Sequence, residues 1–322
     1  MQKSLKVLRK LLFQLGILIG IILLSIQIYQ TWIALSNHSI ELIRFWPLFI
    51  ALIVIMGSIF QQVEVWIILM RSLKIYLPPR EARYGYLLSF LARYIPGTVW
   101  GYISRSEWLW QNYQVSYAKS NYVSLLEVIL AVLGSFVAIG LGIIITGAPV
   151  NSAWTGYLLI LTPLIFWFFL SSKYLLNFLR RNLPSQNFEM SNSNLSFLAW
   201  LGILAILLLN WFYYGLGLFL IGYAFGVWEI SMLPHLWVLL TMDFSLAWLI
   251  GFIVVFIPSG LGLREFVLSS LLVSQFHLAV EVARGISLTM RLATTLAEIM
   301  CIVIVVLIRW NYRNSSVSDP PG

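Results

Sequence analysis

The sequence contains few charged residues and one cysteine. Of its 322 residues, 10% are Asp, Glu, Lys or Arg, and the single cysteine, Cys301, lies inside an apolar run. One cysteine excludes an internal disulfide framework and a multi-cysteine metal site. The only aspartates are Asp243 and Asp319. Because Asp319 belongs to the polar tail, a catalytic pair of intramembrane aspartates is excluded as well.

Catalytic motifs are also missing. The three histidines, His38, His235 and His277, are far apart, and neither H-E-x-x-H nor G-x-S-x-G occurs in the sequence. No nucleophile therefore has a base close to it. We expect no catalytic residue, no metal site and no cofactor, and therefore no enzymatic activity.

Long hydrophobic runs, in contrast, are abundant. The chain is 60% hydrophobic, with a mean hydropathy of +0.90, which exceeds what a soluble core needs. The composition therefore predicts an all-α polytopic membrane protein. The net charge of +8 does not indicate a nucleic-acid partner, because the basic residues occupy short segments between apolar runs.

The apolar runs predict six full transmembrane helices and two interrupted ones. The full spans are expected near residues 11–33, 45–70, 120–146, 154–172, 196–224 and 285–308. The runs 84–110 and 235–276 are interrupted by Pro and Gly, and each is expected to enter and leave the membrane on the same side. The alternative is that 235–276 contains two complete spans. The first run is too long for a signal peptide, so we expect an uncleaved helix; cleavage near 34–36 is the alternative.

Basic residues give the orientation. Of the 20 Lys and Arg, fourteen fall on one predicted face, two on the other, and four lie near membrane depth. By the positive-inside rule the first face is cytoplasmic. Both termini are therefore expected in the cytoplasm of a bacterial-type inner (plasma) membrane.

The predicted spans divide the chain into two similar halves. Residues 1–146 and 147–313 each read as helix, helix, broken pair, helix, and residues 314–322 form a disordered cytoplasmic tail. Three full spans are an odd number, so the second half is inverted relative to the first. An inverted repeat with broken helices is a recurring transporter architecture.

Two motifs mark the interruptions. They are Arg93-Tyr94-Ile95-Pro96-Gly97 and Phe256-Ile257-Pro258-Ser259-Gly260-Leu261-Gly262. A break at membrane depth is tolerated where the freed backbone lines a polar cavity. After each motif a half-helix should begin, and its free N–H groups and positive dipole end favour an anion such as phosphate. The alternative is that Pro and Gly merely kink two ordinary helices.

Ionisable residues at membrane depth complete the candidate site. The substrate-binding candidates are Arg93, Pro96, Gly97, Trp100, Arg105, Glu127, Pro258, Gly260, Gly262, Arg264, Glu265 and Arg291, and the counter-charge or coupling candidates are Glu64, Asp243 and Glu298. Isolated charges at this depth are costly, so they either pair with one another or face a wet cavity. The aromatic residues that follow the first break, from Trp100 to Tyr117, are expected mainly as an interfacial belt, and a lipid-lined groove is the alternative.

The two motifs resemble those of a known family. Ala92-Arg93-Tyr94-Ile95-Pro96-Gly97-Thr98-Val99-Trp100 and Pro258-Ser259-Gly260-Leu261-Gly262-Leu263-Arg264-Glu265 are similar to the motifs of the lysylphosphatidylglycerol synthase transmembrane region, also called the flippase-like or UPF0104 family. Glu127 and Arg291 also resemble its pattern. Ala92, Thr98 and Ser259 depart from the frequent Gly, Lys and Gly, so the headgroup preference of a family member need not transfer. The resemblance implies the flippase half only, without a soluble synthase domain.

The sequence therefore favours a lipid flippase as the function. In this hypothesis Arg93, Arg105 and Arg264 hold the phosphate of an anionic-headgroup or polyprenyl-phosphate-linked lipid. The alternatives are an ion-coupled small-solute transporter and a non-transporting scaffold for envelope lipid or lipid-linked glycan assembly. The expected partners are membrane lipids and, for the scaffold, an envelope glycosyltransferase or lipid-modifying enzyme.

Overall fold

The computed structural model describes residues 44–94, 100–147, 153–171, 196–254, 260 and 262–318, together with positions 25, 29 and 33. Most of the predicted first span, together with Pro96, Gly97 and Pro258, lies outside the described residues. Within those ranges the chain forms nine α-helices and two short 3₁₀-helices, with no strand. The prediction of an all-α fold is confirmed for this part of the chain.

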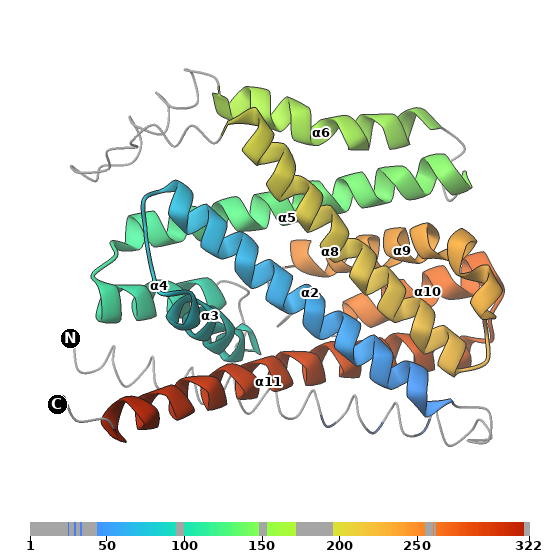
Figure 1. Cartoon of the computed structure of the whole chain (residues 1–322). Helices are drawn as coiled ribbons and strands as arrows, with labels where there is room; N and C mark the ends of the chain where they lie inside the picture. The colour runs from blue at the N-terminus through green and yellow to red at the C-terminus, as the bar shows by residue number, and fades with distance from the viewer. Residues whose placement is uncertain are drawn as a thin grey trace, which may run out of the picture.

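The helices follow one another with short connections (Figure 1). In chain order they are α2 (Phe45–Ser72), α3 (Pro79–Leu88), η2 (Ser89–Tyr94), α4 (Trp100–Tyr113), α5 (Tyr117–Thr146), α6 (Ala153–Ser171), α8 (Phe197–Ala224), η3 (Ile230–Met232), α9 (Leu233–Ile253), α10 (Leu263–Phe276) and α11 (Val280–Ser318).

Five stretches of the described chain are long and apolar enough to cross a membrane. They correspond to α2, α5, α8, η3 with α9, and α11, and four of these match predicted full spans. Helix α6 contributes a shorter apolar stretch, Trp154–Trp167. A helix satisfies all its own backbone hydrogen bonds, which is why apolar runs of this length become helical in lipid.

The interrupted run 235–276 contains two helices of different length. Helix α9 has 21 residues, whereas α10 has 14 and is therefore only about 21 Å long. One arm thus has spanning length and the other does not. That the run enters and leaves the membrane on the same side stays a prediction.

The two interrupted pairs lie at opposite ends of the helix bundle. Helices α3 and α4 lie at the end where both chain termini are marked, and α9 and α10 lie at the other end (Figure 1). Helix α3 packs on α11 and α4 on α5, while α9 and α10 pack on each other. Helix α9 also contacts α5 and α8, and α10 contacts α11, so both pairs are held by the long helices.

Close packing of small residues joins the long helices. A Cβ atom added to Gly140 of α5 would lie 2.6 Å from the carbonyl oxygen of Gly156 in α6, so only glycine permits this approach. Small residues at helix contacts are typical of membrane proteins, where van der Waals packing replaces the hydrophobic effect. The core beneath α2 and α8 is apolar and includes the fully buried Ile55, Trp66 and Leu218.

Polar residues define the helix ends. Ser116 and Ser196 precede α5 and α8, and their hydroxyls accept from the N–H groups of Lys119 and Ala199 at 3.5 and 3.2 Å. These are N-caps, which satisfy N–H groups that have no partner within the helix. Gly147 ends α5 with φ of 71°, the left-handed conformation that glycine adopts most easily.

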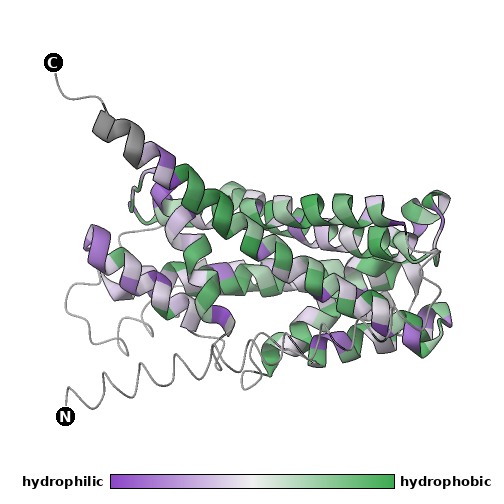
Figure 2. Ribbon diagram, turned by 90° about the horizontal axis from the view of Figure 1, so that it is seen from below, coloured by the Kyte–Doolittle hydropathy of each residue, from purple (hydrophilic) through white to green (hydrophobic). Residues whose placement is uncertain are grey.

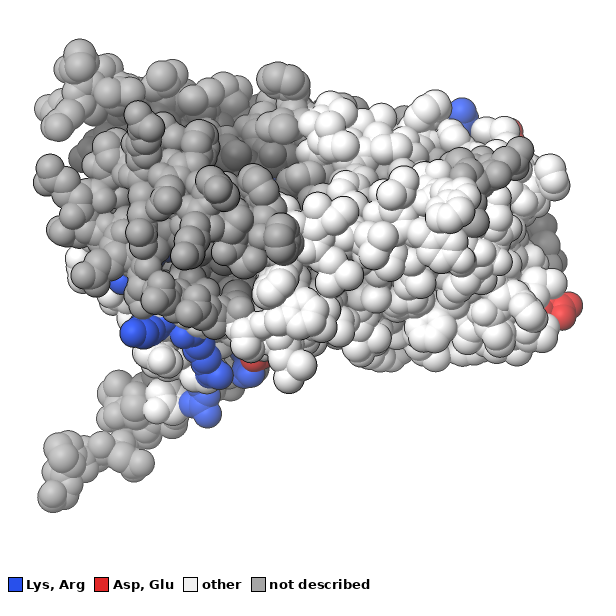
Figure 3. Space-filling view, turned by 90° about the horizontal axis from the view of Figure 1, so that it is seen from above, with Lys and Arg blue, Asp and Glu red and all other residues white. Residues whose placement is uncertain are grey.

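The surface repeats the charge pattern of the sequence. Hydrophobic residues dominate the middle of the bundle (Figure 2), and Lys and Arg gather at one end of the face seen in Figure 3. Exposed basic residues of α2, the turn after it, α3 and α5 are Arg71, Lys74, Arg80 and Lys119. This is the end of the bundle that contains α3 and α4.

Candidate functional site

A cavity of about 160 Å³ lies inside the bundle where the two interrupted pairs approach each other. It is lined by residues of η2 and α4 from the first pair and of α9 and α10 from the second. Helices α2, α5, α8 and α11 provide the remaining walls. The cavity therefore joins the two segments that the Pro/Gly motifs singled out.

Charged residues from both pairs meet in this cavity. The charged lining residues are Arg93, Arg264, Arg291, Glu265 and Glu298. Three arginines against two glutamates give a formal charge of +1. Arginine stays protonated in proteins, so the cavity has an excess of positive charge when both glutamates are ionised.

Arg291 of α11 and Glu265 of α10 are close together but imperfectly paired. Arg291 Nε lies 3.4 Å from Glu265 Oε1, and both side chains are nearly buried, with exposed fractions of 12% and 9%. Glu265 Oε2 accepts from the N–H of Gly262 at 2.6 Å. This N–H group, expected to be free for an anion, is thus used to cap α10. The Nε and Nη2 atoms of Arg291 remain buried without a hydrogen-bond partner among the described residues.

Arg264 is held by packing against glycine and tryptophan. Its guanidinium carbon lies 5.5 Å from the ring centroid of Trp248, within the range of a cation–π contact. A Cβ atom at Gly251 would lie 2.3 Å from Arg264 Cγ, and one at Gly260 would lie 2.8 Å from Arg264 Nε. That Nε atom is buried, with no acceptor in the described part of the chain.

The backbone conformation at position 260 also requires a glycine. Its φ angle is 66°, a conformation that other residues rarely adopt. A Cβ atom there would also lie 2.9 Å from the carbonyl oxygen of Gly251. The glycine of the second motif therefore lets the backbone return close to α9 and places Arg264 beside Trp248.

Arg93 reaches the cavity from the first pair. It lies in the last turn of η2, and its guanidinium carbon lies 3.6 Å from the ring centroid of Phe90. Gly101 of α4 leaves room for its side chain. Helix α4 begins at Trp100 and α10 at Leu263, so the predicted half-helices do follow the motifs. Trp100 does not line the cavity.

Aromatic rings form much of the cavity wall. The aromatic lining residues are Tyr102, Trp211, Tyr214, Phe244, Trp248 and Phe252. Tyr214 and Phe244 are stacked with centroids 4.8 Å apart, and Trp211 meets Trp248 edge to face at 4.9 Å. Tyr102 thus lines the cavity, whereas Trp110 and Tyr117 are exposed and stacked on each other, as an interfacial belt requires.

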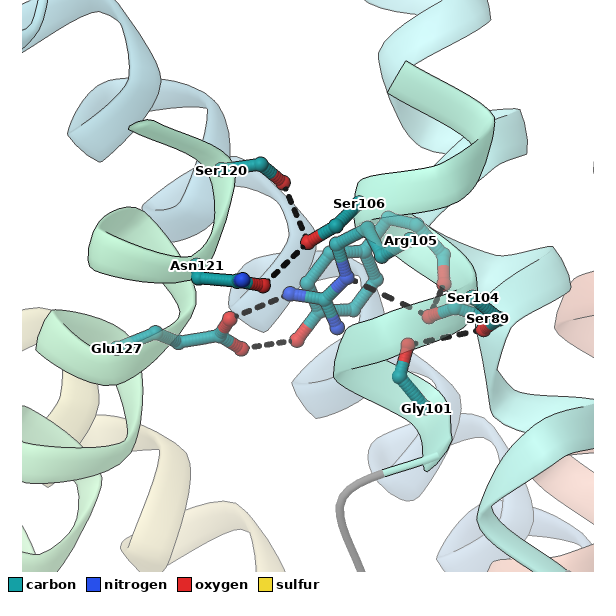
Figure 4. Close-up of polar contacts among 9 residues, drawn as sticks. Ser89, Gly101, Ser104, Arg105, Ser106, Ser120, Asn121 and Glu127 are labelled. Carbon is teal, nitrogen blue, oxygen red and sulfur yellow. Dashed lines mark hydrogen bonds and ion pairs between the residues drawn. The ribbon is translucent and has the colours of Figure 1, made fainter. Parts of the chain in front are cut away.

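Arg105 and Glu127 lie outside the cavity and pair with each other (Figure 4). Arg105 Nη1 donates to Glu127 Oε2 at 2.7 Å, and the two side chains are 0% and 3% exposed. Tyr86 donates to the other carboxylate oxygen, and the Arg105 guanidinium lies over the Tyr86 ring at 3.9 Å. Of the predicted phosphate-binding set, Arg105 therefore follows the ion-pair alternative and Arg93 and Arg264 reach the cavity.

The coupling candidates are dispersed. Glu64 pairs with Arg83 at 2.6 Å, and both are partly exposed. Asp243 is fully buried and accepts from Gln275 at 2.9 Å without lining the cavity. Glu298 lines the cavity. Gly262, one of the substrate-binding candidates, is an exposed residue before α10 with φ of 83°.

Several lining residues were missed by the sequence analysis. Besides the aromatic wall these are the polar residues Gln62 and Asn210. Both interrupt apolar runs, and a polar side chain within a span is itself a signal of function. No comparable signal identifies Trp211 or Trp248, since aromatic residues are common throughout this chain.

Comparison with known proteins supports one relationship. The family model described as "Lysylphosphatidylglycerol synthase TM region" matches residues 12–302. No curated protein and no solved structure gives a significant match to the chain.

Proposed function

Because the chain belongs to the lysylphosphatidylglycerol synthase transmembrane-region family, we propose that it moves a lipid with an anionic headgroup between the two leaflets of the membrane. The observation that carries this proposal is the meeting of Arg93, Arg264 and Arg291 in one internal cavity. The headgroup phosphate binds these arginines during passage. No chemical step is part of the proposal.

Unpaired donors support an anionic ligand. Buried polar groups in proteins nearly always have hydrogen-bond partners. Arg264 Nε and Arg291 Nη2 have none among the described residues, so their N–H groups are available to a ligand. Phosphate oxygens suit guanidinium donors in both charge and geometry.

Cavity size favours a headgroup over a whole lipid. Pockets that enclose drug-sized molecules span roughly 300–1,000 Å³, and this one has about 160 Å³. A phosphate-bearing headgroup is therefore the largest part of a lipid that it accommodates. The acyl or polyprenyl chains stay in the surrounding hydrocarbon, because moving them from lipid into an apolar part of the protein would bring no hydrophobic free energy.

The arrangement of the broken pairs supports alternating access from the two leaflets. One pair lies at each end of the bundle (Figure 1), and both line the cavity. We propose that the chain is an inverted repeat with six full spans, that the basic end faces the cytoplasm of a bacterial-type inner membrane, and that each broken pair closes one side of the cavity. Rocking of inverted repeats around a central site is a known transport mechanism.

Leaflet-resolved lipid exchange in proteoliposomes tests the proposal. Fluorescent phosphatidylglycerol and a polyprenyl-phosphate analogue serve as separate probes, with Arg93→Gln and Arg264→Gln as variants. The matched control is Arg284→Gln, an exposed arginine of α11 outside the cavity. We expect at least one probe to be exchanged by the wild type and the control, and exchange to be lost in both cavity variants with unchanged thermal unfolding. Normal exchange by both variants would exclude the arginine cavity as the lipid path.

A water-soluble anion is the second candidate substrate. The small cavity volume of about 160 Å³ favours it, since inorganic phosphate or a small organic phosphate would fit entirely. Uptake of labelled phosphate by the same proteoliposomes, with no exchange of either lipid probe, would favour this transporter over the flippase.

A further inference from the structure

One pair of buried side chains outside the cavity has more hydrogen-bond acceptors than donors. Asp243 of α9 is 0% exposed, and its Oδ1 accepts from Gln275 Nε2 of α10 at 2.9 Å. Asp243 Oδ2 and Gln275 Oε1 are both buried acceptors without a partner in the described part of the chain. Two unsatisfied acceptors therefore belong to the same pair.

A carboxylic acid and an amide can form two parallel hydrogen bonds. The amide N–H donates to one carboxyl oxygen, and the acid O–H donates to the amide oxygen. The first of these bonds is present between Gln275 and Asp243. A single proton on Asp243 Oδ2 would satisfy both remaining acceptors at once, whereas an ionised carboxylate leaves Oδ2 and Gln275 Oε1 unsatisfied.

No neighbouring positive charge replaces that proton. Helix α9 packs against α5, α8, α10 and η3. Their titratable and charged groups, with those at the adjoining turns and on α9 itself, are Tyr117, Lys119, Tyr122 and Glu127 of α5, Tyr213, Tyr214 and Tyr223 of α8, Arg264 and Glu265 of α10, and Glu229, His235 and His277. None of them forms an ion pair or hydrogen bond with Asp243 that would stabilise a carboxylate in the described structure.

From these contacts we infer that Asp243 and Gln275 form a proton-binding site. Asp243 is a carboxylic acid that donates from Oδ2 to Gln275 Oε1, and the doubled hydrogen bond joins the two arms of the second broken pair. Burial in the membrane disfavours the charged form of a carboxyl group, which agrees with this assignment.

The position of the site connects it to the cavity. Phe244, the next residue of α9, lines the cavity, and Arg264 lies in the first turn of the helix that carries Gln275. Gln275 lies eleven residues after Arg264, about 16 Å along α10, toward the end of the bundle opposite α3 and α4. Loss of the proton would leave a buried carboxylate facing the amide oxygen and would weaken the contact between α9 and α10 there.

Isotope labelling tests the protonation state directly. The chain has only two aspartates, Asp243 and Asp319. In the Asp319→Asn variant, aspartate labelled with ¹³C at the side-chain carboxyl therefore reports on Asp243 alone. We expect the isotope-edited infrared spectrum of the full chain in lipid at pH 7 to show the carbonyl band of a carboxylic acid. The complementary Asp243→Asn variant should show only carboxylate from Asp319, the ordinary form of an aspartate side chain at that pH.

The role of Gln275 has its own control. Gln275→Leu in the Asp319→Asn background should shift the carboxylic-acid band to higher frequency, because the hydrogen bonds are lost. Gln111→Leu, at an exposed glutamine of α4 that bonds Glu107, should leave the band in place. A carboxylate signal from Asp243 at pH 7, or a band unaffected by Gln275→Leu, would overturn the assignment. The measurement includes no transport step, so its result is independent of whether the chain moves lipid.

Discussion

Arg264 owes its position to glycines, because a side chain at either neighbouring position would collide with it. Gly251 faces its Cγ and Gly260 its Nε. Arg264 is thereby packed against Trp248 with its Nε inside the bundle. A substitution at Gly251 therefore changes the cavity without removing any of its charges.

We predict that Gly251→Ala weakens substrate exchange about 10-fold or more. The added methyl would lie 2.3 Å from Arg264 Cγ and must displace the guanidinium. Each lost hydrogen bond to a charged group corresponds to roughly 1.5–3 kcal/mol. Initial exchange rates in proteoliposomes measure the effect. Gly202→Ala is the matched control, since no atom lies within 4 Å of the added Cβ in α8; equal loss in both variants would point to a general effect of alanine in the spans.

We predict that Arg105→Ala and Glu127→Ala each destabilise the fold by roughly 3–5 kcal/mol, because each leaves an uncompensated buried charge. Their salt bridge is 2.7 Å long and almost fully buried. The double variant Arg105→Met/Glu127→Leu should recover part of this loss, since it removes both charges and keeps the volume but leaves the Tyr86 hydroxyl without its acceptor. Unfolding midpoints in detergent provide the measurement. Single variants with normal stability but no exchange would instead assign this pair to the transport path.

The sequence identified these arginines without distinguishing their roles. Arg93, Arg105 and Arg264 all lie close to a Pro/Gly break, and the same rule about intramembrane charge applies to each of them. What separates Arg105 is a partner 22 residues away on α5, together with the hydroxyl of Tyr86. Which of several acids neutralises which base depends on helix packing, and the linear order of residues does not contain that information.

The broken pairs show what local sequence signals can and cannot specify. Pro and Gly ended the helices near the predicted places, with α4 beginning at Trp100 and α10 at Leu263, because both residues act on the backbone locally. A spanning length for α9 was one of the alternatives, whereas the difference in length between α9 and α10 was not anticipated. The aromatic cavity wall was missed because its rings come from α4, α8 and α9.

At the junction of α9 and α10 we predict opposite outcomes for two substitutions of Asp243. Asp243→Asn keeps two hydrogen bonds to Gln275, since an amide pairs with an amide as a neutral acid does, so the unfolding midpoint should stay near that of the wild type. Asp243→Ala leaves both polar groups of Gln275 without a partner, which costs about 1–3 kcal/mol for each unsatisfied buried group. Thermal unfolding of the full chain in lipid nanodiscs at pH 7 distinguishes them. A strongly destabilised Asp243→Asn variant would indicate that the carboxylate form is the one that stabilises α9 and α10.

The charge distribution over the whole bundle determines how it sits in the membrane. Exposed Arg71, Lys74, Arg80 and Lys119 lie at the end with α3 and α4, and Arg44 and Arg284 lie at the opposite end. Translocating basic segments is disfavoured, so we expect the richer end to remain in the cytoplasm. Both interrupted pairs would then return to the side from which they entered, the first from inside and the second from outside.

Cysteine labelling in a Cys301→Ala background tests this orientation. Two labelling positions are chosen for each interrupted segment, one near its start and one near its end. For the first pair, Tyr76→Cys precedes α3 and Gln111→Cys lies in the last turn of α4. For the second pair, Ser231→Cys lies in η3 before α9 and Glu281→Cys in the first turn of α11. All four residues are exposed. A membrane-impermeant maleimide should label the first two only in inside-out vesicles and the other two only in right-side-out vesicles. Reversal of all four would invert the proposed orientation. A split within either pair would mean that its segment crosses the membrane an odd number of times. For the first pair this would give the first half an even number of spans and remove the inverted relationship. For the second pair the two halves would no longer share one layout, and either result would exclude the proposed form of alternating access.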